Sequence, residues 1–363
     1  MKILIVVTKS ELGGAQVFVL NLARGLKSLG EDVTVAGGPG EYLPEELAKS
    51  EIPFYRFKTL ERSYNPLKIF KFARELKDYV KQNEFKVVHL NSTNTLFGVW
   101  SLADLKPQPK IVFTVHGLSF LDPNHHTNFA ISFAYRQFFK LAWKKVASLV
   151  FVSRLNYASA IKRSLVKAGE VIYNGLNFSA DYYLEREEAR KFLALKVGAD
   201  FAGAYLVGSI GRLAYPKNYE FLINSFKEIK KLKPQAKIIL IGDGPERAKY
   251  ETLIKSYRLE KEVYLLGEIK EAGRYLKAFD LFVLPSIFEG MSLSLMEALL
   301  AGVPAIASRV GGSEEIIGAE NCFALDNQAE FLDKLIKARA VRIEDNRFTR
   351  EKMIEGYRKL YLG

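Results

Sequence analysis

Short apolar runs that stop at a glycine-rich or polar loop, and are followed by a helical pattern, occur in both halves of this chain. The first is 3–7, followed by Gly13-Gly14 and by aliphatic residues at helical spacing up to Leu29. A second strand pattern starts at Val33, and such strand–helix–strand units build parallel sheets. Further runs of this kind are 86–90, 110–115 and 147–153, then 205–210, 237–241, 263–266, 281–286 and 303–308. The pattern predicts an α/β protein with two Rossmann-like, doubly wound parallel sheets.

The length and the restart of the pattern predict two domains. The chain has 363 residues, of which 48% are hydrophobic, so each half can build its own core. A polar and charged stretch from Ser179 to Arg190 separates the two sets of apolar runs. We therefore expect a first domain at 1–178 and a second at 179–345.

The positive charge is concentrated in the first half. The net charge is +12, and residues 1–180 hold 24 basic and 14 acidic side chains, against 29 and 27 in the remainder. A basic half favours an acidic partner, such as a membrane surface, a pyrophosphate-linked lipid or a nucleic acid. Nucleic acid is the least supported of these, because the basic residues lie among aliphatic strands and no RNA- or DNA-binding module occurs.

Other features of the composition indicate a cytoplasmic protein. No apolar run reaches the roughly 18–20 residues that a membrane span needs. The N-terminal apolar run predicts a strand rather than a signal peptide. Cys322 is the only cysteine, which excludes an intrachain disulfide and fits a reducing compartment.

The stretch 281–317 carries the most informative chemistry. Glu289 lies where an apolar strand gives way to a helix, and Glu297 follows a little over two helical turns later. A helix start offers backbone N–H groups to an anion, and carboxylates bind sugar hydroxyls, so the pair suits a nucleotide-sugar. The residues at that helix start are Gly290, Met291, Ser292 and Leu293. From spacing alone, two solvated glutamates on an ordinary helix remain the more common alternative.

Five more residues follow predicted strands and suit a phosphorylated ligand, although each has an ordinary structural explanation when taken alone. Gly13 and Gly14 let backbone approach a diphosphate at a helix start. His116 ends a strand, where open α/β sheets bind ligands. Arg212 and Lys217 share a loop and could neutralise a diphosphate. No Asp-x-Asp triplet occurs, so we expect no metal held by that motif.

The amino-acid sequence around these positions resembles that of the retaining glycosyltransferases of family 4, the glycogen-synthase-like or group 1 enzymes. The pattern P-S-x-x-E-G-x-x-L-x-x-x-E-A-L-x-x-G-x-P places that family's E-x7-E pair at Glu289 and Glu297. It departs from the family at Met291-Ser292, where Phe-Gly is common. Similar matches are T-V-H-G at His116, N-G at Asn174, G-R-L-x-x-x-K-N at Arg212 and Lys217, G-D-G-P at Gly242 and Gly244, and G-E-I at Ile269.

The resemblance implies the GT-B fold, with two Rossmann-like domains facing a central cleft, and a metal-independent, retaining transferase that needs no cofactor. It implies a UDP- or GDP-sugar donor whose transferred sugar contacts Glu289, whose ribose contacts Glu297 and whose diphosphate contacts Arg212 and Lys217. His116 and the Gly13-Gly14 pair would reach the donor from the first domain, and the remaining matched residues would line the donor site. A closing helix, about 346–363, would pack back on the first domain.

The acceptor is indicated less directly. In the helical pattern 129–145, Arg136, Lys140 and Lys144 recur every four residues, and Tyr135, Phe139 and Trp143 follow on the neighbouring face. Aromatic residues beside a basic stripe suit a membrane interface, although a helix with core aromatics and solvated lysines fits equally well. We expect a lipid-linked saccharide acceptor in cell-surface glycan or glycolipid assembly, and a peripheral position on the inner face of an anionic membrane. The alternatives are a soluble acceptor, an epimerase of nucleotide-sugars and, least favoured, a nucleic-acid-binding protein.

Overall fold

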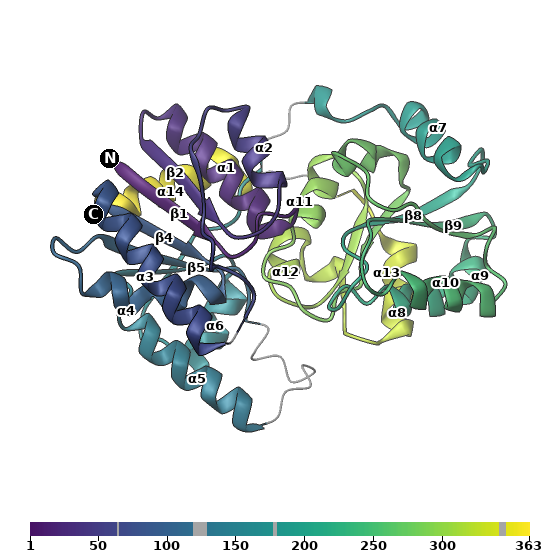
Figure 1. The fold of residues 1–363 in the computed structure, drawn as a ribbon. Coiled ribbons are helices and arrows are strands. Elements are labelled where there is room, and N and C mark those ends of the chain that lie inside the picture. Colours follow the sequence, from purple (N-terminus) through teal and green to yellow (C-terminus); the bar gives the residue numbers. More distant parts are fainter. Residues whose placement is uncertain (64, 119–128, 177–179, 341–345) are drawn as a thin grey trace. The chain divides into compact units, whose positions relative to one another are not determined.

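The structure, a computed structural model, describes residues 1–63, 65–118, 129–176, 180–340 and 346–363 (Figure 1). The chain divides into two compact units. Unit 1 comprises Met1–Leu176 and Asn346–Gly363, and unit 2 comprises Asn177–Asp345. The boundary expected after residue 178 falls among residues 177–179, which lie outside the described part of the chain.

Unit 1 is built on a seven-stranded parallel sheet in the order β3-β2-β1-β4-β5-β6-β7. Its strands are β1 Lys2–Val7, β2 Asp32–Gly37, β3 Phe54–Arg56, β4 Val87–Asn91, β5 Lys110–Val115, β6 Ser148–Phe151 and β7 Glu170–Val171. Strand order reverses between β1 and β4, which pair directly with Ile3 opposite Val87. Ligands of such sheets bind at this reversal, beyond the carboxyl ends of the strands.

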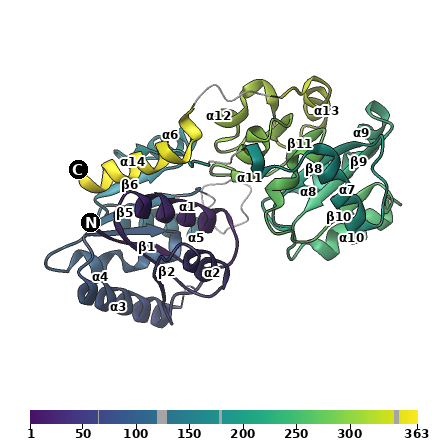
Figure 2. The same cartoon turned by 90° about the horizontal axis from the view of Figure 1, so that it is seen from above.

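Alternation along the strands divides the core of unit 1 between the two faces of the sheet. Ile3, Ile5 and Val7 pack with α1 (Gly14–Ser28), α2 (Tyr42–Ala48) and the closing helix α14 (Arg350–Leu362). Leu4 and Val6 pack on the other face, with α3 (Pro66–Asn83), α4 (Val99–Ala103), α5 (Phe129–Trp143) and α6 (Arg154–Lys162). Figure 2 shows α14 beside α1. The last helix of the chain is thus part of unit 1.

A buried polar network fixes α14 to the sheet. On β4, the two ring nitrogens of His89 lie 2.6 Å from the Tyr361 hydroxyl and 2.7 Å from the Thr114 hydroxyl of β5. The Thr114 hydroxyl also lies 2.9 Å from the Tyr357 hydroxyl. Burial, and to a lesser extent the neighbouring His116, lowers the pKa of His89 to about 3, so the imidazole is neutral at physiological pH.

Unit 2 repeats the architecture with a six-stranded parallel sheet in the order β10-β9-β8-β11-β12-β13. Its strands are β8 Tyr205–Ile210, β9 Ala236–Ile241, β10 Val263–Leu265, β11 Leu281–Leu284, β12 Ala305–Ser308 and β13 Cys322–Phe323. Here the order reverses between β8 and β11. Two Rossmann-like, doubly wound parallel sheets were predicted, and both are confirmed.

The helices of unit 2 cover both faces of its sheet. They are α7 Arg186–Val197, α8 Tyr219–Asn224, α9 Phe226–Leu232, α10 Arg247–Ser256, α11 Leu293–Leu300, α12 Ser313–Ile317 and α13 Gln328–Lys337, with the 3-10 helix η4 Ala272–Ala278. The helical stretch 219–232 is interrupted at Ser225, which is both the C-cap of α8 and the N-cap of α9.

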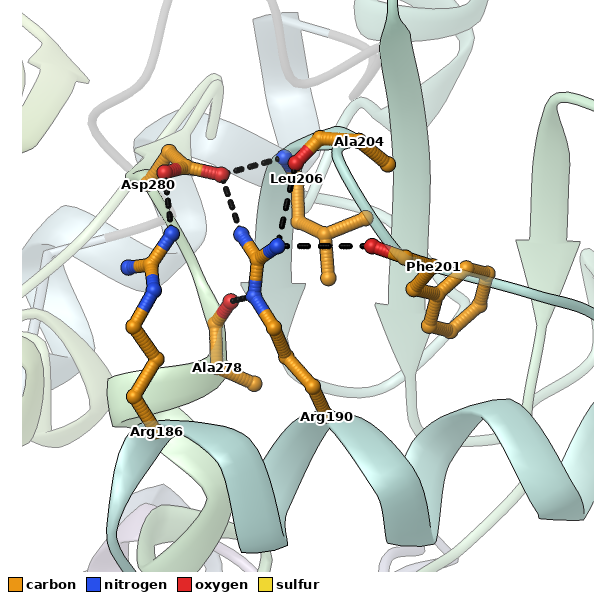
Figure 3. Close-up of polar contacts among 7 residues, drawn as sticks. All are labelled: Arg186, Arg190, Phe201, Ala204, Leu206, Ala278 and Asp280. Carbon is orange, nitrogen blue, oxygen red and sulfur yellow. Dashed lines mark hydrogen bonds and ion pairs between the residues drawn. The ribbon is translucent and has the colours of Figure 1, made fainter.

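Helix α7 is attached to the sheet by a buried arginine (Figure 3). The Arg190 guanidinium donates to the carbonyl oxygens of Ala278 (3.0 Å), Ala204 (3.1 Å) and Phe201 (3.4 Å), and forms an ion pair with Asp280. Asp280 also pairs with the more exposed Arg186 and accepts from the backbone N–H of Leu206 at 2.7 Å. This cluster holds α7 at the amino ends of β8 and β11.

Helix α5 corrects one expectation. Phe139 and Trp143 are buried against Phe113 and Phe151, and Tyr135 packs on the same core cluster. These three aromatic side chains therefore belong to the core and do not form a membrane face, because α5 needs them to cover its side of the sheet. Arg136 and Lys140 are partly buried and Lys144 is exposed. Within the described ranges, no helix is long and apolar enough to cross a membrane.

Candidate active site

The strand reversal of unit 2 brings the two most informative sequence motifs together. Because β8 and β11 are neighbours, the loops that follow them meet at the carboxyl edge, where the Ile287 N–H donates to the Pro216 carbonyl at 2.8 Å. Lys217 Nζ, from the first loop, lies 2.8 Å from Glu289 Oε1, from the second. The Ser286 hydroxyl donates to the same carboxylate oxygen at 2.7 Å. The sheet topology therefore explains why residues 72 positions apart form one site.

Both charges of this pair are shielded from solvent but still reachable. The side chains of Lys217 and Glu289 are 19% and 13% exposed. Desolvation lowers the pKa of Lys217, but the adjacent Glu289 carboxylate and Tyr219 together outweigh it and leave the pKa raised. The site thus holds a permanent cation beside a carboxylate, the two groups that a phosphate and a sugar hydroxyl require.

Two glycines allow the surrounding loops to pack without side chains. Gly242, at φ +138°, lies so close to the Gly211 carbonyl that a Cβ would come within 2.1 Å of its oxygen. Gly311, at φ +52°, lies as close to the Glu289 carbonyl, and the next N–H, from Gly312, donates to Gly290 O at 2.8 Å. The loops after β8, β9, β11 and β12 are therefore joined largely through backbone.

Other predicted donor residues lie on the same edge of unit 2 without touching the charged pair. Arg212 is exposed, and no ion pair joins it to any described residue. The N–H of Gly244 is held by the Asp243 carboxylate at 2.7 Å. Ile269 is partly buried in the loop that follows β10. Arg212 is therefore free to reorient toward an anion, whereas Gly244 contributes to the turn itself.

At the start of α11, Ser292 has a capping role that the sequence analysis did not predict. Ser292 is the N-cap residue, and its hydroxyl accepts from the Leu295 N–H at 3.4 Å. The departure from Phe-Gly at Met291-Ser292 thus supplies a cap, for which serine is a preferred residue. Leu293 is the first residue of the helix, and Met291, just before the cap, is buried.

Glu297, on α11, occupies a different environment from Glu289. Burial raises the pKa of Glu297 to about 7. A Cβ on Gly273 of η4 would lie 3.3 Å from both Glu297 Oε2 and the Tyr182 hydroxyl, so these polar atoms pack closely around the glycine. The neighbouring Tyr183 hydroxyl donates to the Glu297 backbone carbonyl at 3.3 Å. Glu289 is therefore ion-paired, whereas Glu297 has no cationic partner among the described residues.

Unit 1 contributes a separate set of predicted residues at its own strand reversal. Gly13 is the N-cap of α1, and a Cβ on Gly14 would meet nothing within 4 Å, which leaves this helix start open to a ligand. His116 follows β5, with Nε2 3.0 Å from Asn91 Oδ1 and its ring 4.7 Å from the Phe18 ring. Asn174 is buried beyond β7. No group of three potential metal ligands occurs among the described residues of either unit.

Comparison with protein families assigns both units. The model described as glycosyl transferases group 1 matches residues 195–359, and the model described as glycosyltransferase family 4 matches residues 12–180. An uncharacterised glycosyltransferase of Methanocaldococcus jannaschii is 30% identical over 72% of this chain and 62% of its own length.

Two further comparisons concern substrates and fold. The UDP-Gal:α-D-GlcNAc-diphosphoundecaprenol α-1,3-galactosyltransferase of Escherichia coli is 27% identical over 87% of this chain and 82% of its own length. The crystal structure of the Anabaena protein HepE in complex with UDP and glucose superposes with a TM-score of 0.79 and 20% identity, covering all of both chains. The likeness shows that the fold is GT-B.

Proposed function

This chain belongs to the group 1 glycosyltransferases, and we propose that it transfers a sugar from a nucleotide-sugar to an acceptor, with retention of configuration and without a metal ion. The observation that carries the proposal is the Lys217–Glu289 pair at the strand reversal of unit 2. The Escherichia coli relative is named for a UDP-sugar, and the Anabaena structure holds UDP and glucose. Both support a UDP-sugar as the first donor to test.

We assign the diphosphate to Lys217 and Arg212. Negative charge develops on the diphosphate as the glycosidic bond breaks, and cations already in place stabilise that charge without reorganisation. Lys217 is held ready by Glu289, and Arg212 is unpaired and exposed. Each charge-assisted hydrogen bond contributes roughly 1.5–3 kcal/mol, so Lys217→Met or Arg212→Ala should each lower turnover at least about tenfold. Full activity in both variants, or loss of wild-type activity in EDTA, would contradict this assignment.

The two glutamates have separate roles in this proposal. Glu289, ion-paired with Lys217 and hydrogen-bonded to Ser286, contacts the transferred sugar, and Glu297, close to Gly273, contacts the ribose. Titration calorimetry with the free nucleoside diphosphate separates the roles. Glu297→Gln should weaken binding, whereas Glu289→Gln should leave binding intact and lower turnover. An equal loss of nucleotide affinity in both variants would refute the division.

Retention requires the acceptor oxygen to attack the face that the diphosphate leaves. The bond from the anomeric carbon to the diphosphate breaks, a bond to the acceptor oxygen forms, and the acceptor proton passes to the leaving diphosphate. NMR of the product measures the outcome directly. An α-linked donor should give an α-linked product. Conversion of the donor alone into an epimer, with no acceptor present, would instead establish the epimerase alternative.

The acceptor that we propose is a lipid-linked saccharide. The Escherichia coli relative is named for a diphosphoundecaprenol acceptor. With Tyr135, Phe139 and Trp143 packed on the core, the outer side of α5 carries the exposed Phe133 and Leu141, near the partly buried Lys140 and the exposed Lys144 just after the helix. Exposed apolar side chains beside lysines suit an anionic membrane surface, where each lysine contributes about 1 kcal/mol.

Co-sedimentation with liposomes tests the membrane contact. Binding should require anionic lipid, fall as salt rises, and be lost in the double variant Lys140→Glu/Lys144→Glu. The double variant Lys230→Glu/Lys231→Glu, on α9 of unit 2, is the charge-matched control and should bind like the wild type. If the wild type stays in the supernatant at low salt, the acceptor is soluble rather than membrane-bound.

A further inference from the structure

The inference concerns Asn91, the last residue of β4. Its side chain is fully buried, and it lies on the same face of the sheet as His89, two residues earlier. On the adjacent strand, Thr114 is the register partner of Asn91, and His116 follows two residues later on that face. Asn91 Oδ1 and His116 Nε2 are 3.0 Å apart, which is hydrogen-bond distance.

The orientation of the Asn91 amide follows from its second contact. Asn91 Nδ2 lies 3.3 Å from the backbone carbonyl oxygen of His89. A carbonyl oxygen only accepts hydrogen bonds, so the amide nitrogen must face it, and the amide oxygen must face His116. That amide oxygen is also only an acceptor. Consequently the proton of this hydrogen bond belongs to His116 Nε2.

The protonation state of the other ring nitrogen of His116, Nδ1, then follows. Burial lowers the pKa of His116 to about 4, so the ring is neutral near pH 7 and carries a single proton. With that proton on Nε2, the Nδ1 atom has a lone pair. No hydrogen bond joins Nδ1 to any residue in the described ranges. The ring of Phe18 packs against the His116 ring in an edge-to-face arrangement, with an angle of 72° between the two ring planes.

We propose that Asn91 is a positioning residue that holds His116 as the Nε2–H tautomer, so that Nδ1 accepts a hydrogen bond from a sugar hydroxyl of the substrate. The sugar contact rests on the proposed glycosyltransferase function, whereas the tautomer rests only on the contacts of unit 1. Asn91 itself does not touch the substrate in this proposal. Its effect passes through the protonation site of His116.

The tautomer is measurable without substrate. The chain has four histidines, so selective ¹⁵N labelling of histidine gives few ring signals, and a His116→Gln variant assigns those of His116. In the wild type at neutral pH, His116 should show a protonated Nε2 and a bare Nδ1. In Asn91→Leu, which removes the acceptor at similar size, the two nitrogens should shift toward a mixture of tautomers. Asn91→Asp keeps an acceptor oxygen facing His116, so Nε2 should stay protonated in that variant.

The signals of His89 provide the internal control, because they should not change if Asn91→Leu leaves the fold intact. In turnover assays with UDP-glucose, Asn91→Leu should lower kcat/KM about tenfold, the loss expected for one misdirected hydrogen bond, and Asn91→Asp should restore most of it. A protonated Nδ1 in the wild type, or a His116 spectrum unchanged by Asn91→Leu, overturns the proposal. An inactive wild type with the expected tautomer would overturn only the proposed function.

Discussion

Removal of Arg190 should destabilise unit 2 strongly and leave unit 1 unchanged. The Arg190 side chain is 11% exposed and holds Asp280 together with three backbone carbonyls. Breaking such a shielded ion pair costs about 3–5 kcal/mol, because the remaining groups lose their partner. Arg186→Ala is the matched control. Arg186 pairs with the same carboxylate but is 44% exposed, so its loss should cost less than about 1 kcal/mol.

Urea unfolding measured with two probes distinguishes the units. Both tryptophans, Trp100 and Trp143, lie in unit 1, and Cys322, the only cysteine, is buried in unit 2. With a denaturant slope of about 1–3 kcal/mol/M, a loss of about 3–5 kcal/mol in Arg190→Ala should lower the midpoint of Cys322 labelling by roughly 1–5 M. The tryptophan fluorescence transition should stay in place. Equal shifts for Arg190→Ala and Arg186→Ala, or a matching shift of the tryptophan transition, would refute this account of the cluster.

Three further outcomes are expected. The pKa of His89 is about 3 in the folded protein, below its unfolded value of about 6.5. The contribution of His89 to stability is therefore complete above about pH 6.5. As the pH falls below that value, this contribution is lost at about 1.4 kcal/mol per pH unit. His89→Gln should remove that part of the pH dependence of urea midpoints. The pKa of Glu297 is raised to about 7, so its ionisation costs stability as pH rises, and Glu297→Gln should raise the melting temperature at pH 8 but hardly at pH 5. Ser292→Ala removes the cap of α11 and should cost about 1 kcal/mol in the same unfolding assay.

The sequence predicts the two sheets well because buried parallel strands are continuous apolar runs. The strand expected at 205–210 is found at Tyr205–Ile210, and the run 110–115 likewise matches β5. Short elements were not predicted. Strand β3 has three residues and β13 has two, and segments of that length carry no periodicity. Their pairing depends on neighbouring strands rather than on their own residues.

The candidate site was predictable only in part. The motifs name Lys217 and Glu289 but do not indicate their direct contact, which depends on β8 and β11 being neighbours. Alternation of aromatic and basic residues on α5 could not distinguish a core face from a membrane face, because both are equally apolar. The buried partner of His116 was missed as well. Asn91 directly follows the apolar run 86–90, and only the pairing of β4 with β5 places it beside the imidazole.

The most direct test of the central claim is thermal unfolding of the full chain with UDP-, GDP- and ADP-sugars and with EDTA present. A ligand at about 100 times its dissociation constant stabilises the native state by about 2.7 kcal/mol. We predict that sugars of one nucleotide raise the melting temperature of the wild type by several degrees. Lys217→Met, which removes the cation beside Glu289, should lose most of that increase. If none of these nucleotide-sugars stabilises the wild type, or if Lys217→Met responds as the wild type does, the site at the strand reversal of unit 2 is not the donor site.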